Sequence, residues 1–422
     1  MSAPERDPAA RADRRTVLWS GLAGAGVATG LAAATVVGAR TVPPPAPAPG
    51  ATPGSAAASP PSSTADARAI ARPAGFRGAH QAGILEAPPA HATLVALDLV
   101  PDADAETVRR LLTVWTDDIE RLTSGRGTLT DLEPELATVT ARLTVTVGVG
   151  RAVVELAGGA VPDWLAPLPA FPIDRLEERW SGGDLFLQIC ATSPTTVAHA
   201  QRRLLVGVAD LAKVRWVQRG FREPHEGSGV PMRNLFGQVD GTVQPDVAGV
   251  DAALLWAGDG GPAWLRGGTS VVVRRIAMDL DAWDRADRLS RENALGRRLD
   301  TGAPVTGTSP QDVPDLEAVD ALGFHAIDDA SHLRRAHATA PHERFLRRPY
   351  SYDDPPTGGA TSSSGLVFIA FQADPVRQFL PVQRRLAEVD LLNLWTTPVG
   401  SAVFAVLPGA ARGEILGEAL LT

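Results

Sequence analysis

Two periods of hydrophobic and polar residues divide the chain between about residues 76 and 232 into regular elements. Apolar residues three and four positions apart predict helices at 104–124 and 195–211. Short alternating or continuous apolar runs predict strands at 92–100, 143–149, 185–191 and 214–218. The resulting order, strand-helix-strand-strand-helix-strand, is that of a ferredoxin-like (split βαβ) unit.

The chain from residue 233 onward partly repeats this pattern. Strands are predicted at 269–278, 366–372 and 402–407, and helices at 281–296, 374–389 and from 410 onward. Between residues 297 and about 365 there is no regular period, and loops of such length in compact domains are usually functional. The predicted fold class is therefore α+β, with two ferredoxin-like halves, 76–232 and 233–422, packed together.

The first 39 residues have the pattern of an export signal. Arg14 and Arg15 precede a run of mostly Gly, Ala, Val and Leu that reaches about Gly38, and paired arginines there indicate the twin-arginine export machinery. The run is long enough for a retained membrane anchor, but its Gly and Ala content favours cleavage. Residues 40–75, rich in Pro, Ala and Ser, are predicted to be a linker. We therefore expect an extracellular or cell-envelope protein.

Composition narrows the classes of partner and cofactor. The net charge of −8 and the pI of about 5.6 argue against a nucleic acid bound through its phosphates. Cys190 is the single cysteine, so no internal disulfide can form, and its apolar neighbours predict a buried thiol. Export of a folded protein without disulfides indicates a cofactor that is loaded in the cytoplasm.

The segment 233–245 contains the first candidate for chemistry. Asp240 lies directly before Gly241 and shortly after Gly237, so the backbone can turn sharply and approach a flat or bulky group. As a bare pattern, Asp-Gly is more often a turn than a reactive carboxylate. Both interpretations stay open on this segment alone.

Histidines are concentrated in the long irregular stretch, at His325, His332, His337 and His342. A structural zinc site needs Cys, His or Asp ligands at short, defined spacings, which steps of five residues and a single cysteine do not provide. One histidine can instead be the axial ligand of haem iron. The alternative is that all four are solvated loop side chains.

Residues 237–242 read Gly-Gln-Val-Asp-Gly-Thr, which resembles the Gly-x-x-Asp-Gly-Thr motif of the dye-decolorising peroxidases, a haem peroxidase family. Further blocks that resemble this family follow in order through most of residues 76–422, at 80–84, 180–185, 214–221, 261–269 and 398–402. The exported form with these blocks is similar to the subclass that includes the deferrochelatase/peroxidase of bacterial iron-uptake systems.

The resemblance implies a double ferredoxin-like fold with haem b between its halves. It places the proximal iron ligand on His332, the distal acid-base residue on Asp240 and the distal arginine on Arg347. Hydrogen peroxide would be the oxidant, and a bulky organic compound such as a dye or phenol would be the electron donor.

The resemblance also implies further haem contacts. The backbone would pass along the haem at Gly241, Thr242 and Val243, and Arg297 would pair with a propionate. The chain departs from the family at Gln238, which is often aromatic, at Gln244, which is usually Asn, and at Ala338, which is usually Pro. These departures leave the named catalytic groups in place. Gln238 would change the polarity of the distal pocket and the proton route, and Ala338 would change the haem contacts of the loop after His332.

The chemistry of peroxide cleavage fits these assignments. A proton must move from one peroxide oxygen to the other, and one carboxylate can act as base and then as acid. With an unperturbed pKa of about 3.9, Asp240 would favour mildly acidic pH. Arg347 stays charged and would stabilise the departing hydroxide. His332 needs an acceptor for its second ring nitrogen; Asp328 and Asp329 are near in sequence, which does not choose between them.

Large donors would require aromatic residues that relay electrons from the surface. Tyr350, Tyr352, Trp264 and Trp283 are candidates, with packing in the core as the more common role of such side chains. The leading hypothesis is a secreted haem b peroxidase. The alternatives are a haem-binding or iron-supply protein that releases iron from haem, and a scaffold that has lost haem. Retention of Asp240 and Arg347 favours the enzyme, and assembly into a homo-oligomer is left open.

Overall fold

A computed structural model describes residues 75–223, 232–356 and 358–422. The predicted export signal (1–39) and the predicted linker up to residue 74 lie outside the described residues. All described residues belong to one unit of the chain, residues 62–422. Within the described ranges, no helix is both long enough and apolar enough to cross a membrane.

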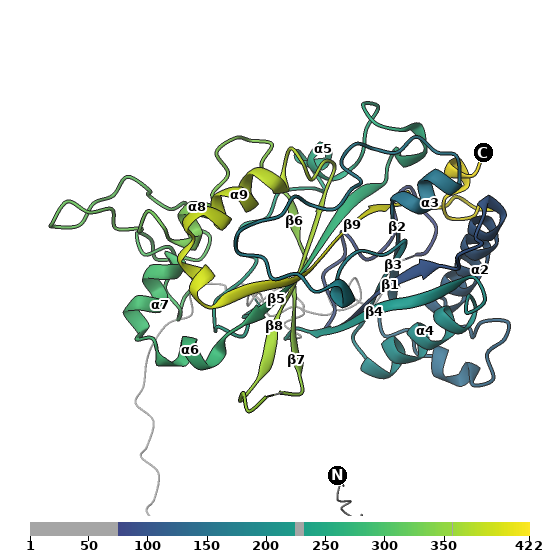
Figure 1. Cartoon of the computed structure of the whole chain (residues 1–422), viewed down its shortest axis with the longest axis horizontal. Coiled ribbons are helices and arrows are strands. Elements are labelled where there is room, and N and C mark those ends of the chain that lie inside the picture. Colours follow the sequence, from purple (N-terminus) through teal and green to yellow (C-terminus); the bar gives the residue numbers. More distant parts are fainter. Residues whose placement is uncertain (1–74, 224–231, 357) are drawn as a thin grey trace, which may run out of the picture. The chain divides into compact units, whose positions relative to one another are not determined.

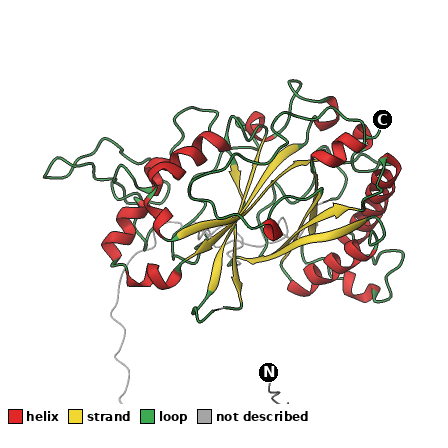
Figure 2. Ribbon diagram, in the orientation of Figure 1, coloured by secondary structure: helices red, strands yellow, loops and turns green. Residues whose placement is uncertain are grey.

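The described strands differ in length and form one sheet, in which every strand pairing is antiparallel (Figures 1 and 2). Their order is β5-β9-β2-β3-β1-β4-β7-β8-β6, and β8 also pairs with β5, so all but β6 form a closed ring. The strands are β1 His91–Leu99, β2 Thr144–Val149, β3 Leu185–Ala191, β4 Ala212–Phe221, β5 Thr269–Met278, β6 Leu346–Arg347, β7 Tyr350–Asp354, β8 Ser363–Gln372 and β9 Thr396–Val406.

The ring consists of two groups of four strands joined by short seams. Strands β2-β3-β1-β4 come from the first half of the chain, and β9-β5-β8-β7 come from the second. Between the groups, Gly148 and Val149 of β2 pair with Val406 and Ala405 of β9, and at the other seam Phe221 of β4 pairs with Ser351 of β7. The long ladders therefore lie within each group.

Helices flank the strands (Figure 2). They are α2 Ala105–Thr123, α3 Arg151–Leu156, α4 Pro194–Val206, α5 Ala252–Leu255, α6 Leu280–Arg285, α7 Arg288–Leu295, α8 His332–Ala336 and α9 Phe379–Val389. Helix α2 begins at a capping box, in which Asp104 accepts from the backbone N–H of Thr107 and the Thr107 hydroxyl accepts from that of Asp104. Its apolar face, as the period predicts, is buried.

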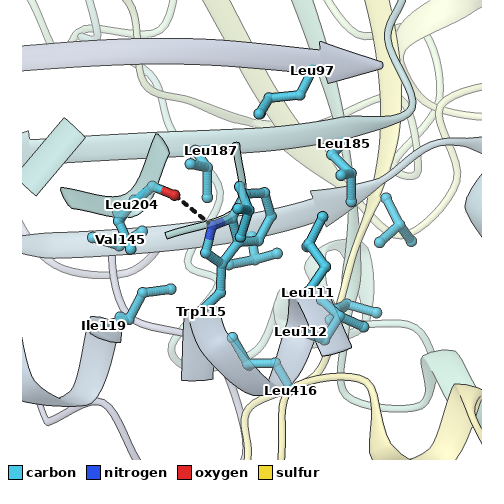
Figure 3. Packing of buried hydrophobic residues seen from close by; sticks show 14 of the residues in the cluster. Leu97, Leu111, Leu112, Trp115, Ile119, Val145, Leu185, Leu187, Leu204 and Leu416 are labelled. Atoms are coloured by element: carbon cyan, nitrogen blue, oxygen red, sulfur yellow. Dashed lines mark hydrogen bonds between the residues drawn. The ribbon is translucent and has the colours of Figure 1, made fainter. Parts of the chain in front are cut away.

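Trp115 lies at the centre of the core between α2, α4 and the first strand group (Figure 3). Its side chain is fully buried, and its indole N–H donates to the carbonyl oxygen of Leu204 at 3.0 Å. Its neighbours include Leu111, Ile119 and Leu187. The indole ring of Trp115 thus fills the space between α2 and α4, and its buried N–H has a hydrogen-bond acceptor.

Replacing Trp115 by alanine is expected to lower the free energy of unfolding by about 3 to 5 kcal/mol, because it leaves a cavity in a closely packed core. Chemical denaturation followed by circular dichroism measures this change. Thr113 lies exposed on the other face of α2, and Thr113→Ala should change the same quantity by less than about 0.5 kcal/mol. Equal effects of the two substitutions would contradict the packing described.

The carboxyl of Asp118 on α2 makes stability depend on pH. Burial, together with the neighbouring charge of Asp117, raises its pKa from 3.8 to about 6. The folded state then binds this proton more tightly than the unfolded state, so stability falls as pH rises from about 4 to 6. Asp118→Asn should therefore stabilise the protein by about 1 to 2 kcal/mol at about pH 8 and by almost nothing near pH 4. Urea unfolding at both pH values tests this, with exposed Asp210→Asn as the control.

The second half differs from the sequence prediction in its helices. The helix predicted at 281–296 is two helices, because Ala286 is extended (ψ 139°) and the Asp287 side chain caps α7 by accepting from Ser290 N at 2.9 Å. The last predicted helix, from 410 onward, is wrong. Only a 3₁₀ turn, Glu418–Leu420, forms there, since Gly413 and Gly417 take positive φ.

The stretch 297–365 is less irregular than predicted. It contains α8, β6, β7 and the beginning of β8. Strands β6 and β7 are short and pair with β8, so their conformation is set by a partner rather than by their own apolar period. The helix predicted at 374–389 begins only at Phe379, because Asp374 accepts from the N–H groups of Val376 and Arg377 in a preceding turn.

Candidate active site

Asp240 follows a tight turn that its own sequence builds. Asn234 N donates to Gln238 O at 3.0 Å, and the Asn234 carboxamide oxygen accepts from Phe236 N and Gln238 N. Gly237 takes a φ of 75° inside the turn, a conformation that disfavours other residues. Asp240 N then donates to Met232 O at 2.8 Å, which fixes the exit of the turn.

The turn is also held against the segment after α7. The Arg233 guanidinium donates to the carbonyl oxygens of Leu299 and Asp300, each at 2.6 Å, and to Gly237 O at 2.7 Å. Gly302 packs so closely that a Cβ there would lie 2.6 Å from Cβ of Val239. These contacts place the Asp240 carboxylate on a well-supported backbone.

Arg347 on β6 reaches this carboxylate. Its Nη1 lies 3.4 Å from Oδ1 of Asp240, and its Nη2 donates to Val243 O at 3.1 Å. The Asp240 side chain is 11% exposed and that of Arg347 is 28% exposed, so neither is sealed in the core. The structure therefore brings together a carboxylate and a guanidinium that lie 107 residues apart.

His332 is the first residue of α8, whose start is capped by Ser331. The Ser331 hydroxyl accepts from Arg334 N at 3.4 Å, and Ser331 is fully buried. Arg335 ties the helix to α9 through Arg385 O and the Glu388 carboxylate. The result is a histidine held beside the end of α9.

Asp390, at the end of α9, is the partner of the His332 ring. Its Oδ2 lies 2.6 Å from Nδ1 of His332, and its other oxygen accepts from Leu392 N at 2.9 Å. The two acids near in sequence act elsewhere. Asp328 accepts from Ala330 N, and Asp329 pairs with His325 and Arg334. No local pattern singles out Asp390, which lies 58 residues from the histidine.

The electrostatics of His332 link it to the other two side chains. Burial opposes the charged ring, but the Asp390 carboxylate outweighs this effect, and the pKa of His332 lies above its ordinary value. The charges of Arg347 and Asp240 also act on this pKa, the first lowering it and the second raising it. The three side chains thus belong to one site.

The donor set of this site fits haem. Nδ1 of His332 is committed to Asp390, and the side chain is 29% exposed, so Nε2 is the nitrogen that can bind iron. An Asp–Arg pair within electrostatic reach of that histidine supplies the proton acceptor and the fixed positive charge that peroxide chemistry requires.

The other expected haem contacts lie around this core. Gly241 takes a φ of 83°, Thr242 is half-buried, and Val243 is exposed. Arg297 is buried and donates to Gly302 O and Pro310 O. Burial and the charge of Arg347 lower the pKa of Arg297, which places it near the site, although its hydrogen bonds within the described structure reach neither Asp240 nor His332.

The two glutamines that depart from the family pattern have different surroundings. Gln238 accepts from the Asn234 side chain at 3.1 Å and so belongs to the turn before Asp240. Gln244 pairs through its side-chain amide with the backbone of Arg347. No local pattern indicates the contact of Gln244 with Arg347, since it joins residues 103 positions apart.

The candidate relay aromatics are core residues. Tyr350, Tyr352, Trp264 and Trp283 are all buried, so packing in the core, the more common role of such side chains, is confirmed for them. Cys190 is buried as predicted, and its sulfur accepts from the Tyr350 hydroxyl at 3.6 Å. Burial raises the pKa of the Cys190 thiol.

Comparisons with known proteins match the chain to one family. The profiles "Dyp-type peroxidase, N-terminal" and "Dyp-type peroxidase, C-terminal" match residues 81–222 and 231–411. The chain is 37% identical to a dye-decolorizing peroxidase of Thermobifida fusca, over 86% of this chain and 89% of that protein. It is 34% identical to a deferrochelatase of Escherichia coli, over 86% and 90%. A crystal structure of a DyP-type peroxidase from Cellulomonas bogoriensis superposes with a TM-score of 0.80 at 55% identity, covering 82% of this chain and 97% of that one.

Proposed function

Because this chain belongs to the DyP-type peroxidase family and is a haem peroxidase, we propose that His332, Asp240 and Arg347 carry its reaction. The main support for these roles is the contact of Arg347 with Asp240. The charges of both side chains also act on the pKa of His332. When bound, haem supplies the iron that takes up the two oxidising equivalents of hydrogen peroxide.

His332 would hold the iron through Nε2. Asp390 fixes the ring orientation and the tautomer, since its carboxylate accepts from Nδ1–H, and it makes the imidazole a more basic ligand. Gly241, Thr242 and Val243 would contact the porphyrin by their backbone, and Arg297 would pair with a propionate.

Asp240 would move the proton. As base, its carboxylate takes a proton from one oxygen of hydrogen peroxide, and as acid it returns that proton to the other oxygen, which leaves as water. Two one-electron donors and two further protons then complete the reduction to a second water molecule. The backbone of the turn holds the carboxylate in place for both steps.

Arg347 would stabilise the negative charge that develops on the leaving oxygen. Its guanidinium stays charged at all relevant pH values and offers several N–H donors in one plane. Because Nη2 is held by Val243 O and Nη1 by Asp240, the group is oriented before peroxide arrives.

We also propose that the fold consists of two ferredoxin-like halves, 76–232 and 233–422. In each group of four ring strands, the order by sequence is fourth-first-third-second, which supports this interpretation. The paired Arg14 and Arg15 support a twin-arginine signal at 1–39, a linker at 40–75 and an extracellular or cell-envelope location.

The electron donors proposed are bulky dyes and phenols. The relative named deferrochelatase supports a second candidate, release of iron from haem with the porphyrin left intact. Both activities would use haem in the same site, so they are compared in one preparation.

The test is turnover by haem-loaded protein with hydrogen peroxide and a phenolic one-electron donor, measured from about pH 3 to 8. We expect oxidation that needs peroxide and is fastest at mildly acidic pH. In parallel, an iron chelator and porphyrin fluorescence detect release of iron without peroxide. Iron release with no donor oxidation at any pH would replace the peroxidase by the second candidate.

A further inference from the structure

Arg347 lies on a two-residue strand at the edge of the sheet. In β6 it is paired with Ala370 of β8, but the hydrogen bond to β8 at this place is made by the next residue, with Arg348 N donating to Ile369 O at 2.9 Å. The N–H and C=O of Arg347 therefore point away from the sheet. A strand of two residues makes few backbone hydrogen bonds, so little within β6 holds Arg347 in place.

The side chain of Gln244 occupies this outer edge. Its Oε1 accepts from Arg347 N at 3.0 Å, and its Nε2 donates to Arg347 O at 2.8 Å. One carboxamide thus makes the two bonds that a neighbouring strand would make. The preceding residue, Val243, accepts from the Arg347 guanidinium, so two consecutive residues hold the backbone and the side chain of the same arginine.

We propose that Gln244 is a positioning residue that acts through Arg347, an inference that rests on the proposed function of that arginine. The two hydrogen bonds of the Gln244 carboxamide fix the backbone from which the Arg347 guanidinium extends toward Asp240. A shift of that backbone would lengthen an Asp240–Arg347 contact that is already 3.4 Å. Gln244 is a solvent-exposed residue, so its bonds compete with water and its effect is moderate rather than absolute.

The two hydrogen bonds of Gln244 predict graded effects for substitutions at this position. Glutamine offers a donor and an acceptor together, a glutamate carboxylate offers acceptors alone, and methionine of similar length offers neither of comparable strength. Gln244→Glu should therefore keep the bond from Arg347 N and lose the bond to Arg347 O, whereas Gln244→Met should lose both. Gln311 is exposed in another loop, where its side chain accepts from the Ser309 hydroxyl at 2.9 Å, and Gln311→Met serves as the matched control.

The first measurement is amide hydrogen exchange at Arg347 in the haem-free protein. Gln244→Met should accelerate exchange about tenfold, because the N–H loses its acceptor. Gln244→Glu should keep most of the protection, and Gln311→Met should keep all of it. A general loosening of the segment would instead accelerate exchange in both Gln244 variants alike and would overturn the proposal.

The second measurement is the rate of reaction of haem-loaded protein with hydrogen peroxide. Gln244→Met should slow it about tenfold with haem still bound, and should have no further effect in an Arg347→Leu background, since its action passes through that arginine. Independent, multiplying losses in the double variant would overturn the proposal. A wild-type protein that does not react with peroxide would contradict the proposed function itself, and the exchange series would still decide whether Gln244 holds Arg347.

Discussion

Replacing Asp240 by alanine is expected to slow the reaction of the haem-loaded protein with hydrogen peroxide by about 10² to 10⁴-fold. The carboxylate is the group placed to take the proton from peroxide, and its contact with Arg347 keeps it beside the charge that would stabilise the products. Stopped-flow absorbance at increasing peroxide concentration gives the second-order rate constant directly.

A second acid of the same segment provides the control for Asp240. Asp246 is exposed six positions further on and accepts no hydrogen bond from Arg347 in the described structure. Asp246→Ala should leave the rate constant within about twofold of wild type, and both variants should bind haem normally. An Asp240→Ala protein as fast as wild type would remove the acid-base role from this residue.

Replacing His332 by alanine is expected to weaken haem binding by more than about 100-fold, because loss of the iron's own ligand should cost more than the loss of a partner that orients it. Asp390→Asn should weaken it by about 10 to 100-fold, the range found for partners that orient a metal-binding histidine. This expectation rests on the distance of 2.6 Å between Oδ2 of Asp390 and Nδ1 of His332. Titration of haem into haem-free protein, followed by absorbance, measures both affinities.

The control for Asp390 is an acid that is closer to the histidine in sequence but not in contact with its ring. Asp329 pairs with His325 and Arg334 instead, so Asp329→Asn should leave haem affinity nearly unchanged. Asp390→Asn should also raise the reduction potential of the bound iron, since a less basic imidazole stabilises the oxidised iron less. Equal behaviour of the two variants would mean that the Asp390 contact does not tune the ligand.

The regular parts of the fold could be predicted where burial imposes a period on the sequence. The strands predicted at 185–191 and 269–278 have the bounds found for β3 and β5, and the buried face of α2 matches its apolar period. Strands β6 and β7 could not be found in this way, because they are short and owe their conformation to β8. The break before α7 depended on an N-cap inside an otherwise continuous helical pattern.

The candidate site, like the fold, could be predicted from the sequence only in part. The segment around Asp240 made it a candidate, since the turn that supports it is built from adjacent residues, and the resemblance to the family motif then assigned it a role. Asp390 and the contact of Gln244 with Arg347 were out of reach, because each joins segments distant in the chain through side chains with no distinctive pattern. Tyr350 and Tyr352 are buried, which is the more common role of aromatic side chains, and their proximity in sequence to Arg347 did not determine their exposure.

The most direct test of the central claim is an absorption spectrum of the haem-loaded protein before and after one equivalent of hydrogen peroxide, followed by a phenolic donor. The proposed function predicts one haem per chain, a rapid spectral change on addition of peroxide, and return to the starting spectrum when the donor is added. Bound haem whose spectrum ignores peroxide would contradict the claim, as would a protein that binds no haem.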